Sequence, residues 1–458
     1  MNRIRAVVGA EIVLRDLSIR SIERLRFALS YPHPERAKAA RLGLSTAGLP
    51  MRFECITEWP DGSISVPRGA VDIVREVLAA DDVGVDFEDQ RSVGLPIGPM
   101  PRLDLRAYQT TGILRLENKA QGMIVLPCGA GKTFGGVGAI ARLGRTAIIL
   151  VHTEDLLDQW VEEIRTKLQI EPGVVDADRK EIDRPIVVAS IFSLAPLLET
   201  DPAIGARFGV VLLDEAHHVP AATFQRVIRY LPARYRLGLT ATPDREDGHG
   251  KMVDWSFGPR LLVKTVQELV SGGFLMMPRF VAVPTAFDFE MDPNDKHRLT
   301  KLHRAIVANA DRNRLIADLA MWEAQAGETV LVLSNRKPHC RKLGKMIAEM
   351  GVEVRVVLGT TKKSERRESL DDLRTGKIAV VVATSLANEG LNIPRLSRII
   401  LAFPDRSYGW TVQRAGRLTR KWEGKDPVLY DVVDPAVETL ASRAGARRRA
   451  YRSIGIDA

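Results

Sequence analysis

The chain has 458 residues, enough for about three domains that each have a core of their own. Its formal net charge of +9 favours a polyanionic partner such as nucleic acid. The chain has no apolar run of membrane-spanning length and no signal-peptide core, so we expect a cytoplasmic protein without a membrane partner. Three widely separated cysteines exclude a disulfide framework and a zinc site.

The first 95 residues combine two predicted helices with a hairpin. The helices span residues 22–29 and 71–78, and the hairpin strands 53–59 and 63–66 flank a Pro-Asp-Gly turn. We therefore predict a separate, small N-terminal α+β domain over residues 1–95. A segment rich in glycine and proline follows it and reads as a linker.

From residue 123 to residue 433 the chain repeats one pattern, in which a short β-branched run is followed by a loop and an amphipathic helix. This alternation is typical of parallel sheets covered by helices, so the predicted fold class is α/β. So many strands exceed one doubly wound sheet and indicate two domains. The predicted strands are residues 147–151, 186–189, 210–213, 236–240, 279–283, 329–333, 352–358, 378–383, 398–402 and 428–433.

The helix after the run 147–151 carries its apolar residues on one face. The stripe consists of Leu156, Leu157, Trp160, Val161, Ile164 and Leu168. We interpret the whole stripe, including the tryptophan, as core without a functional role.

A strand at residues 123–126 leads directly into a glycine-rich turn. Gly129 and Gly131 lack side chains, so backbone N–H groups there can close around phosphate oxygens. Lys132 is predicted to reach the terminal phosphates, and the Thr133 hydroxyl to ligate Mg²⁺. The alternative is a tight turn with a surface lysine. The predicted nucleotide-binding residues of this loop are Pro127, Cys128, Gly129, Ala130, Gly131, Lys132 and Thr133.

An acidic pair follows the apolar run 210–213. Such a run is typical of a parallel strand buried on both faces, and ligands bind at the carboxyl ends of these strands. We predict that Asp214 holds Mg²⁺ and that Glu215 orients and deprotonates the attacking water. Together, the loop and the pair predict hydrolysis of a nucleoside triphosphate.

The second half of the chain lacks a phosphate loop but contains an arginine-rich segment, residues 413–420. Arginine suits multidentate phosphate contact, so we expect this segment to complete the nucleotide site across a cleft. The spacing of Arg417 and Arg420 predicts that both lie on one helix face. A basic surface helix is the alternative for any one of these arginines.

The predicted domain order follows from these features. Residues 96–275 form the first α/β domain, residues 276–325 a linker or reduced insertion, and residues 326–458 the second α/β domain. The basic tail of the last domain either contacts the phosphate backbone of nucleic acid or is a solvated helix. Its arginines are Arg443, Arg447, Arg448, Arg449 and Arg452.

The ordered motifs over residues 102–433 resemble those of the superfamily 2 DEAH/DExH-box helicases, which have two RecA-like domains in tandem. The motifs are Leu105-Arg-Ala-Tyr-Gln109, the phosphate loop, residues 150–160, residues 187–191, Asp214-Glu-Ala-His217, Leu239-Thr-Ala-Thr242, residues 383–394 and residues 413–420.

The resemblance implies roles for residues of each motif. Arg106 and Gln109 would read the adenine of ATP. His152, Thr153, Ser190 and Thr384 would contact nucleic acid, while Glu389 and Gly390 would contact the nucleotide. His217, Thr240 and Thr242 would couple hydrolysis to strand contact. Gln413, Arg417 and Arg420 would form the arginine-finger motif, and the implied cofactors are ATP and Mg²⁺.

Within the superfamily the chain is similar to XPB-type DNA helicases of bacteria and phages. Arg245, Glu246 and Asp247 reproduce an element that follows the Thr-Ala-Thr motif in that group and is linked there to duplex opening. The resemblance also implies a DNA-recognition role for the N-terminal domain. Two departures are Leu126, at the place of the first loop glycine, and Asn392, where the group usually has aspartate.

The sequence thus predicts a monomeric, ATP-dependent DNA helicase or translocase that acts on forked or junction DNA. A duplex translocase that does not separate strands is one alternative. Another is a DNA-binding ATPase subunit of a repair or defence complex, activated by a partner. No nuclease motif is recognisable, so cleavage would need a nuclease or repair partner.

Overall fold

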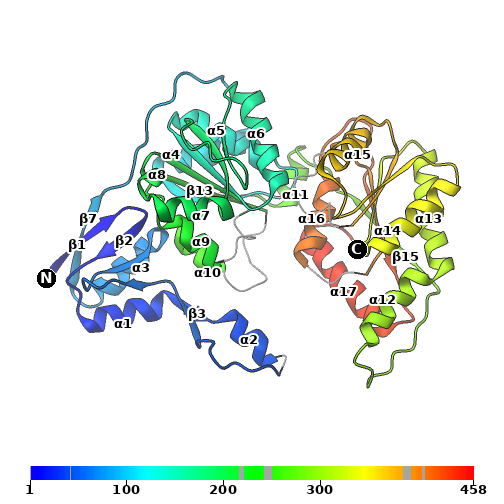
Figure 1. The fold of residues 1–458 in the computed structure, drawn as a ribbon, viewed down its shortest axis with the longest axis horizontal. Coiled ribbons are helices and arrows are strands. Elements are labelled where there is room, and N and C mark those ends of the chain that lie inside the picture. Colours follow the sequence, from blue (N-terminus) through cyan, green and yellow to red (C-terminus); the bar gives the residue numbers. More distant parts are fainter. Residues whose placement is uncertain (1, 42, 216–220, 242–249, 385–392, 405–407) are drawn as a thin grey trace. The chain divides into compact units, whose positions relative to one another are not determined.

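The computed structural model describes residues 2–41, 43–215, 221–241, 250–384, 393–404 and 408–458 (Figure 1). By its contacts the chain divides into two units. One comprises Met1–Leu126 and Gly131–Val263, and the other Pro127–Ala130 and Lys264–Ala458. Within the described ranges, no helix has the length and apolarity needed to cross a bilayer.

The N-terminal part of the first unit is a five-stranded sheet in the order β5-β6-β2-β1-β7. Only the β1–β7 pair is parallel. Helices α1 and α3 contact each other and bury Leu25, Val74 and Leu78 in the core of this part. The elements are β1 (Asn2–Val8), β2 (Glu11–Leu14), α1 (Ile19–Ala28), β3 (Ser30–Pro32), α2 (Pro34–Arg41), β4 (Arg52–Glu54), β5 (Thr57–Glu58), β6 (Ile64–Pro67), η1 (Arg68–Ala70), α3 (Val71–Ala79) and β7 (Val83–Asp89).

The predicted hairpin forms only in its second half. β5 pairs with β6 as expected, but the predicted strand 53–59 is split, and β4 pairs with β3 instead. The Tyr31 and Phe53 rings stack with their centroids 5.3 Å apart, and the Cys55 N–H donates to the Leu29 carbonyl at 2.9 Å. These contacts draw the first half of the strand away from the hairpin.

The rest of the first unit is a seven-stranded parallel sheet in the order β10-β11-β9-β12-β13-β8-β14. Its strands are buried apolar runs, as both faces of a covered parallel sheet require. The elements are α4 (Ala107–Lys119), β8 (Gln121–Val125), α5 (Lys132–Leu143), β9 (Ala147–Val151), α6 (Glu154–Leu168), β10 (Gly173–Val175), β11 (Ile186–Ser190), α7 (Ile191–Thr200), α8 (Ala203–Ala206), β12 (Val210–Asp214), α9 (Ala221–Ile228), β13 (Tyr235–Thr240), α10 (Gly250–Phe257) and β14 (Arg260–Val263).

Two buried arginines join the N-terminal sheet to this parallel sheet. Arg68 donates to the Ala233 carbonyl at 2.7 Å and to the Gln121 side chain at 2.5 Å. Arg236 donates to the Ala10 carbonyl at 2.9 Å, and burial lowers the pKa of its guanidinium to about 10. Because a buried guanidinium needs its acceptors, these bonds fix the N-terminal sheet on the parallel sheet.

The second unit contains a six-stranded parallel sheet in the order β15-β20-β19-β16-β18-β17. The two sheets therefore confirm the prediction of two α/β domains. The elements are α11 (Val266–Ser271), β15 (Arg279–Pro284), α12 (Arg298–Ala308), α13 (Ala310–Gln325), β16 (Val330–Leu333), α14 (Lys337–Glu349), β17 (Val354–Val357), α15 (Lys363–Thr375), β18 (Val380–Ala383), β19 (Arg398–Leu401), α16 (Tyr408–Leu418), β20 (Val428–Val433) and α17 (Glu438–Ser453).

The interval 276–325 differs from the predicted linker or insertion. β15 is an edge strand paired with β20, and α13 buries Ile316, Ala317 and Ala320 against the sheet. The interval is therefore mostly an integral part of the second unit. Three-residue β10 and the edge strand β14 had no predicted counterpart, because such short runs carry little periodicity.

The basic tail forms α17, which packs on α16 and β20. Arg447 is buried in it and binds Asp431 of β20 at 2.8 Å. Arg447 is therefore neither solvated nor available to contact a nucleic-acid backbone, so both interpretations of the tail are wrong for this residue. Arg448 and Arg449 are exposed and remain compatible with either reading.

We expect Arg447→Ala to destabilise the protein by about 3–5 kcal/mol, because it leaves the Asp431 carboxylate buried without its guanidinium. Arg449→Ala, on the exposed side of the same helix, should change stability by about 0.5 kcal/mol or less. Urea unfolding of the full chain measures both. Equal stabilities of the two variants would contradict the structural role of the Arg447 pair.

Candidate functional site

The predicted phosphate loop connects the end of β8 to the start of α5. Gly129 and Gly131 have φ angles of 81° and 78°, a left-handed conformation that favours glycine. Gly131 is also the N-cap of α5, so the helix begins at Lys132. The N-terminal end of this helix therefore lies at the loop, where the helix dipole favours an anion.

The loop lysine and the acidic pair meet in the first unit. Lys132 Nζ lies 3.6 Å from Glu215 Oε1 and 3.3 Å from the Leu126 carbonyl oxygen that it binds. Both charged side chains are largely buried, at 10% and 14% exposure. The structure thus brings together two segments that lie more than 80 residues apart in the sequence.

Asp214 is buried at the carboxyl end of β12, in the middle of the parallel sheet. Its Oδ2 accepts a hydrogen bond from Trp160 Nε1 at 2.8 Å, and its Oδ1 accepts from the Glu215 N–H at 2.9 Å. Burial, followed by the negative charge of Glu215, raises the pKa of Asp214 to about 6. Lys132 and the tryptophan bond oppose this shift because they stabilise the charged carboxylate.

Glu215 has a φ of 49°, in the left-handed region that residues with a side chain seldom adopt. This conformation ends the extended backbone of β12 directly after the buried carboxylate. Strain of this kind clusters at functional sites, where the surrounding structure holds it. It supports the prediction that the acidic pair is a functional site.

Gln109 is buried and ties the segment before α4 to the phosphate loop. Its Nε2 donates to the Gly131 carbonyl at 2.9 Å, and its Oε1 accepts from the Arg106 N–H at 2.9 Å. The Arg106 guanidinium donates to the Tyr108 hydroxyl at 2.8 Å. The two residues predicted to read adenine therefore lie next to the loop.

Two neighbouring residues of α6 contact the predicted magnesium ligands, and our sequence reasoning missed both. Gln159 Nε2 donates to Thr133 Oγ1 at 3.0 Å, and Trp160 Nε1 reaches Asp214. Trp160 is fully buried, as predicted, but its N–H group gives it a second role. The available signal was a pair of hydrogen-bond donors, Gln-Trp, next to an otherwise apolar stripe.

The predicted nucleic-acid contacts of the first unit gather at one edge of the sheet. His152 and Thr153 follow β9, and Ser190 ends the neighbouring strand β11, paired with Val151. The Thr153 hydroxyl also caps α6 by accepting from the Leu156 N–H at 3.3 Å. Thr240 ends β13, and its carbonyl accepts from the Leu126 N–H, so it lies beside the phosphate loop.

The second unit holds the predicted arginines in a different arrangement from the one expected. Arg417 is buried on α16, but the helix ends at Leu418, and Arg420 forms an isolated bridge with Leu275. The expected common helix face for the two arginines is therefore wrong. The Thr419 carbonyl accepts from the Met276 N–H at 2.7 Å, which draws the chain out of the helix before Arg420.

Thr384 lies at the end of β18 and is buried. Its hydroxyl accepts from the Gly359 N–H at 3.1 Å, so part of its hydrogen-bonding capacity stabilises the second unit. The remaining predicted site residues lie outside the described residues: His217, Thr242, Arg245, Glu246, Asp247, Glu389 and Gly390, with the side chain of Gln413.

The Asp214 carboxylate and the Thr133 hydroxyl suit Mg²⁺, which prefers oxygen ligands and is commonly held by one or two protein groups together with phosphates. Within the described ranges, no cluster of three or more histidine, cysteine, aspartate or glutamate residues could hold a metal ion. The site therefore fits a metal bound together with a nucleotide. It does not resemble a cage built from protein ligands alone.

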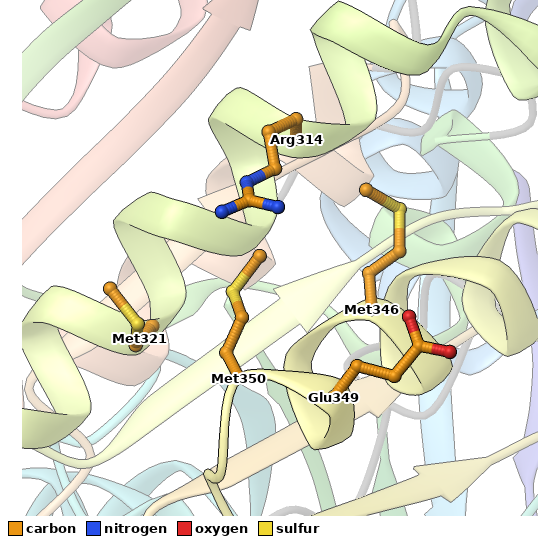
Figure 2. Close-up of a pocket in the computed structure, with 5 residues that line it drawn as sticks. All are labelled: Arg314, Met321, Met346, Glu349 and Met350. Atoms are coloured by element: carbon orange, nitrogen blue, oxygen red, sulfur yellow. The ribbon is translucent and has the colours of Figure 1, made fainter.

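A separate cavity of about 360 Å³ lies between α13 and α14 (Figure 2). Its lining consists of Arg314, Met321, Met346, Glu349 and Met350. These side chains include none of the predicted site residues, so we do not assign the cavity to the nucleotide.

Family models match both halves of the chain. Residues 102–245 match the type III restriction enzyme res subunit, and residues 311–421 match the helicase conserved C-terminal domain. The DNA 3'-5' translocase XPB2 of Sulfurisphaera tokodaii is 27% identical over 82% of this chain and 91% of its own. The DNA 3'-5' helicases XPB of Mycobacterium tuberculosis and Kineococcus radiotolerans are 29% and 31% identical, over 76% and 69% of this chain and 63% and 56% of theirs.

Solved structures confirm the fold. S. cerevisiae Dbp5 bound to RNA and ADP BeF3 matches 77% of this chain and 93% of its own, with a TM-score of 0.56 and 16% identity. The type ISP restriction-modification enzyme LlaBIII bound to DNA matches 78% of this chain and 30% of its own, with a TM-score of 0.58 and 17% identity. At these identities the likeness supports the two RecA-like domains and nothing finer.

We expect Gly136→Ala to destabilise the protein by about 1–3 kcal/mol through overpacking. A Cβ at Gly136, on α5, would lie 2.5 Å from the Trp160 ring and 2.8 Å from Leu212. The matched control is Gly135→Ala, whose Cβ would make only an ordinary contact at 3.8 Å. Thermal unfolding measures both, and equal melting temperatures would contradict the packing of Trp160 on Gly136.

Proposed function

We propose that this chain, which belongs to the superfamily 2 helicases and resembles its XPB-type DNA helicases, couples ATP hydrolysis to movement along DNA and to its unwinding. The observation that carries the proposal is the meeting of Lys132 and Glu215 beside the buried Asp214. A cation for the phosphates, a carboxylate for a metal and a second carboxylate for water are the groups that phosphoryl transfer requires.

Each site residue of the first unit then has one role in hydrolysis. Backbone N–H groups of the loop surround the phosphates, and Lys132 neutralises their charge. Gln109, which donates to the Gly131 carbonyl, would contact the adenine together with the neighbouring Arg106. Glu215 orients the attacking water and accepts its proton.

Asp214 and Thr133 would hold Mg²⁺, which supplies charge neutralisation on the phosphate oxygens when it is bound. The coordinated state of Asp214 is the carboxylate. The Trp160 N–H and the nearby Lys132 both favour that charged form. The Trp160 hydrogen bond and the charge of Lys132 thus support the metal role of Asp214.

The second unit would supply the arginines. We propose that Arg417 stabilises the charge on the transferring phosphoryl group and that Gln413 and Arg420 contact the same nucleotide. Arg420 lies beyond the end of α16, so its contact with the nucleotide would not require the helix face that carries Arg417. Glu389 and Gly390 complete the nucleotide contacts in this proposal.

Movement requires that DNA be held with different affinity before and after hydrolysis. His152, Thr153 and Ser190 would grip the strand on the first unit, and Thr384 on the second. Thr240 and Thr242, with His217, would couple ATP hydrolysis to these contacts with the strand. Arg245, Glu246 and Asp247 would act in duplex opening, as the resemblance implies.

Translocation on duplex DNA without strand separation is a second candidate function. It is favoured by the integration of residues 276–325 into the second unit, which leaves little chain for a strand-splitting insertion. The S. tokodaii relative is named a translocase and the two bacterial relatives are named helicases, so both activities occur under this family name. A nuclease or repair protein would be a suitable partner for either.

We expect Lys132→Ala and Glu215→Gln to abolish DNA-stimulated ATPase activity, because they remove the phosphate cation and the base. Lys119→Ala, at the exposed end of α4, should keep wild-type turnover. Phosphate release with single-stranded, duplex and forked DNA, and with RNA, is the measurement. Persisting turnover in folded Lys132→Ala or Glu215→Gln would exclude the assigned site, and stimulation by RNA alone would exclude a DNA motor.

Arg417→Ala should lower kcat by about 1,000-fold or more while ATP affinity changes far less, since an arginine finger acts in the transition state. The control is Lys421→Ala, which removes an exposed cation three residues beyond Leu418. Single-turnover hydrolysis and binding of a fluorescent ATP analogue separate the two effects. A loss of affinity alone would contradict the finger role.

Strand displacement and triplex displacement distinguish the two candidate functions. A helicase releases a strand from a forked duplex, whereas a duplex translocase displaces only the third strand of a triplex. We expect wild-type protein to do both in the presence of ATP and Mg²⁺. Triplex displacement without strand release would favour the second candidate.

A further inference from the structure

We propose that Gln159 and Trp160 of α6 are positioning residues that fix the two magnesium ligands and link them to the DNA-contacting start of the same helix. The proposal rests on the proposed function for the identity of the ligands. It assigns a role in metal binding to a helix that both the sequence pattern and the resemblance connect with packing and strand contact alone.

Trp160 is oriented by its seat in the core. Gly136 of α5 lacks the Cβ that would lie 2.5 Å from the indole, so the ring packs directly against the helix backbone. The ring is fully buried, and its single donor, Nε1, points to Asp214 Oδ2 at 2.8 Å. A phenylalanine would fill most of this space, so the N–H group is what the site gains from tryptophan.

The tryptophan bond leaves the carboxylate only part of its acceptor capacity. Oδ1 accepts from the Glu215 N–H, and Oδ2 accepts from Trp160. The carboxylate therefore has a fixed orientation before any ligand arrives. Such partners of metal ligands commonly set the affinity of a site, because they determine which lone pairs face the ion.

Gln159 acts on the other ligand. Its Nε2 donates to Thr133 Oγ1 at 3.0 Å. A hydroxyl that accepts this bond keeps its own hydrogen for another acceptor and retains a lone pair for a cation. Adjacent donors on one helix thus contact the hydroxyl of α5 and the carboxylate of β12.

Helix α6 connects this contact to the predicted DNA site. It begins after its N-cap Thr153, next to His152, and Gln159 follows after about 9 Å of helix. Leu156, Leu157 and Ile164 are buried along its length, so the helix is one continuously packed element between the two sites. A shift of its start on DNA binding would therefore reach both metal ligands.

The test uses the full chain with Trp160→Phe, which keeps an aromatic ring without the N–H group, and Gln159→Leu, which keeps about the same side-chain volume. We expect each to raise the Mg²⁺ concentration for half-maximal DNA-stimulated ATPase activity by about 10- to 100-fold. Electron paramagnetic resonance of Mn²⁺, with a non-hydrolysable ATP analogue and no DNA, should show a similar loss of metal affinity. Affinity for the analogue in EDTA should stay within about twofold.

Matched controls are Trp322→Phe and Gln325→Leu, both on the exposed side of α13. They should leave Mn²⁺ affinity and the Mg²⁺ requirement unchanged. The link along α6 adds a third arm, in which His152→Ala should lower DNA stimulation without changing Mn²⁺ affinity in the absence of DNA. Stimulation equal to that of wild type in this variant would overturn the link.

Wild-type Mn²⁺ affinity and an unchanged Mg²⁺ requirement in folded Gln159→Leu and Trp160→Phe would overturn the proposal. If Trp160→Phe fails to fold, Gln159→Leu decides alone, since Gln159 is not part of the buried apolar stripe. Absence of ATPase activity in wild-type protein would contradict the proposed function instead. The Mn²⁺ measurement would still decide whether these residues position the ligands.

Discussion

A carboxylate buried at the end of a central parallel strand is the constraint on which the site depends. Asp214 is buried, and this burial together with the charge of Glu215 raises its pKa to about 6. Its two oxygens accept from Trp160 and from the Glu215 N–H, and Lys132 lies close enough to favour its charge. Trp160 belongs to α6 and Lys132 to the start of α5, so both helices must meet the end of β12 for the carboxylate to be tolerated.

The parts that could be predicted from sequence are those with a local physical signature. Buried parallel strands read as apolar runs, and the strand ending at Asp214 was predicted to within one residue. The phosphate loop was predictable because its glycines occupy left-handed positions that few other residues adopt. The two sheets followed from the alternation of strands and helices, and the structures with RecA-like folds agree with them.

The remaining features depend on contacts between distant segments, which periodicity does not encode. The sequence around Phe53 is typical of a hairpin, but in the fold this residue stacks on Tyr31. Arg447 lies in a basic segment typical of solvated residues, but in the fold it binds Asp431. Arg420 has helical spacing from Arg417, but a bridge to Leu275 ends the helix first. In each case a tertiary partner outweighs a local preference of about 1 kcal/mol or less.

Trp160 shows how one side chain can satisfy two requirements that sequence analysis treats as alternatives. A position in an apolar stripe indicates core packing, and the ring is indeed fully buried. Yet burial is also what makes its N–H group effective, because a hydrogen bond to a charged acceptor is stronger where water is excluded. Gly136 permits the close approach, and the glycine therefore contributes to the electrostatics of Asp214 although it has no polar side chain. The packing of the indole and its hydrogen bond to Asp214 are consequently linked, since a larger residue at position 136 would disturb both.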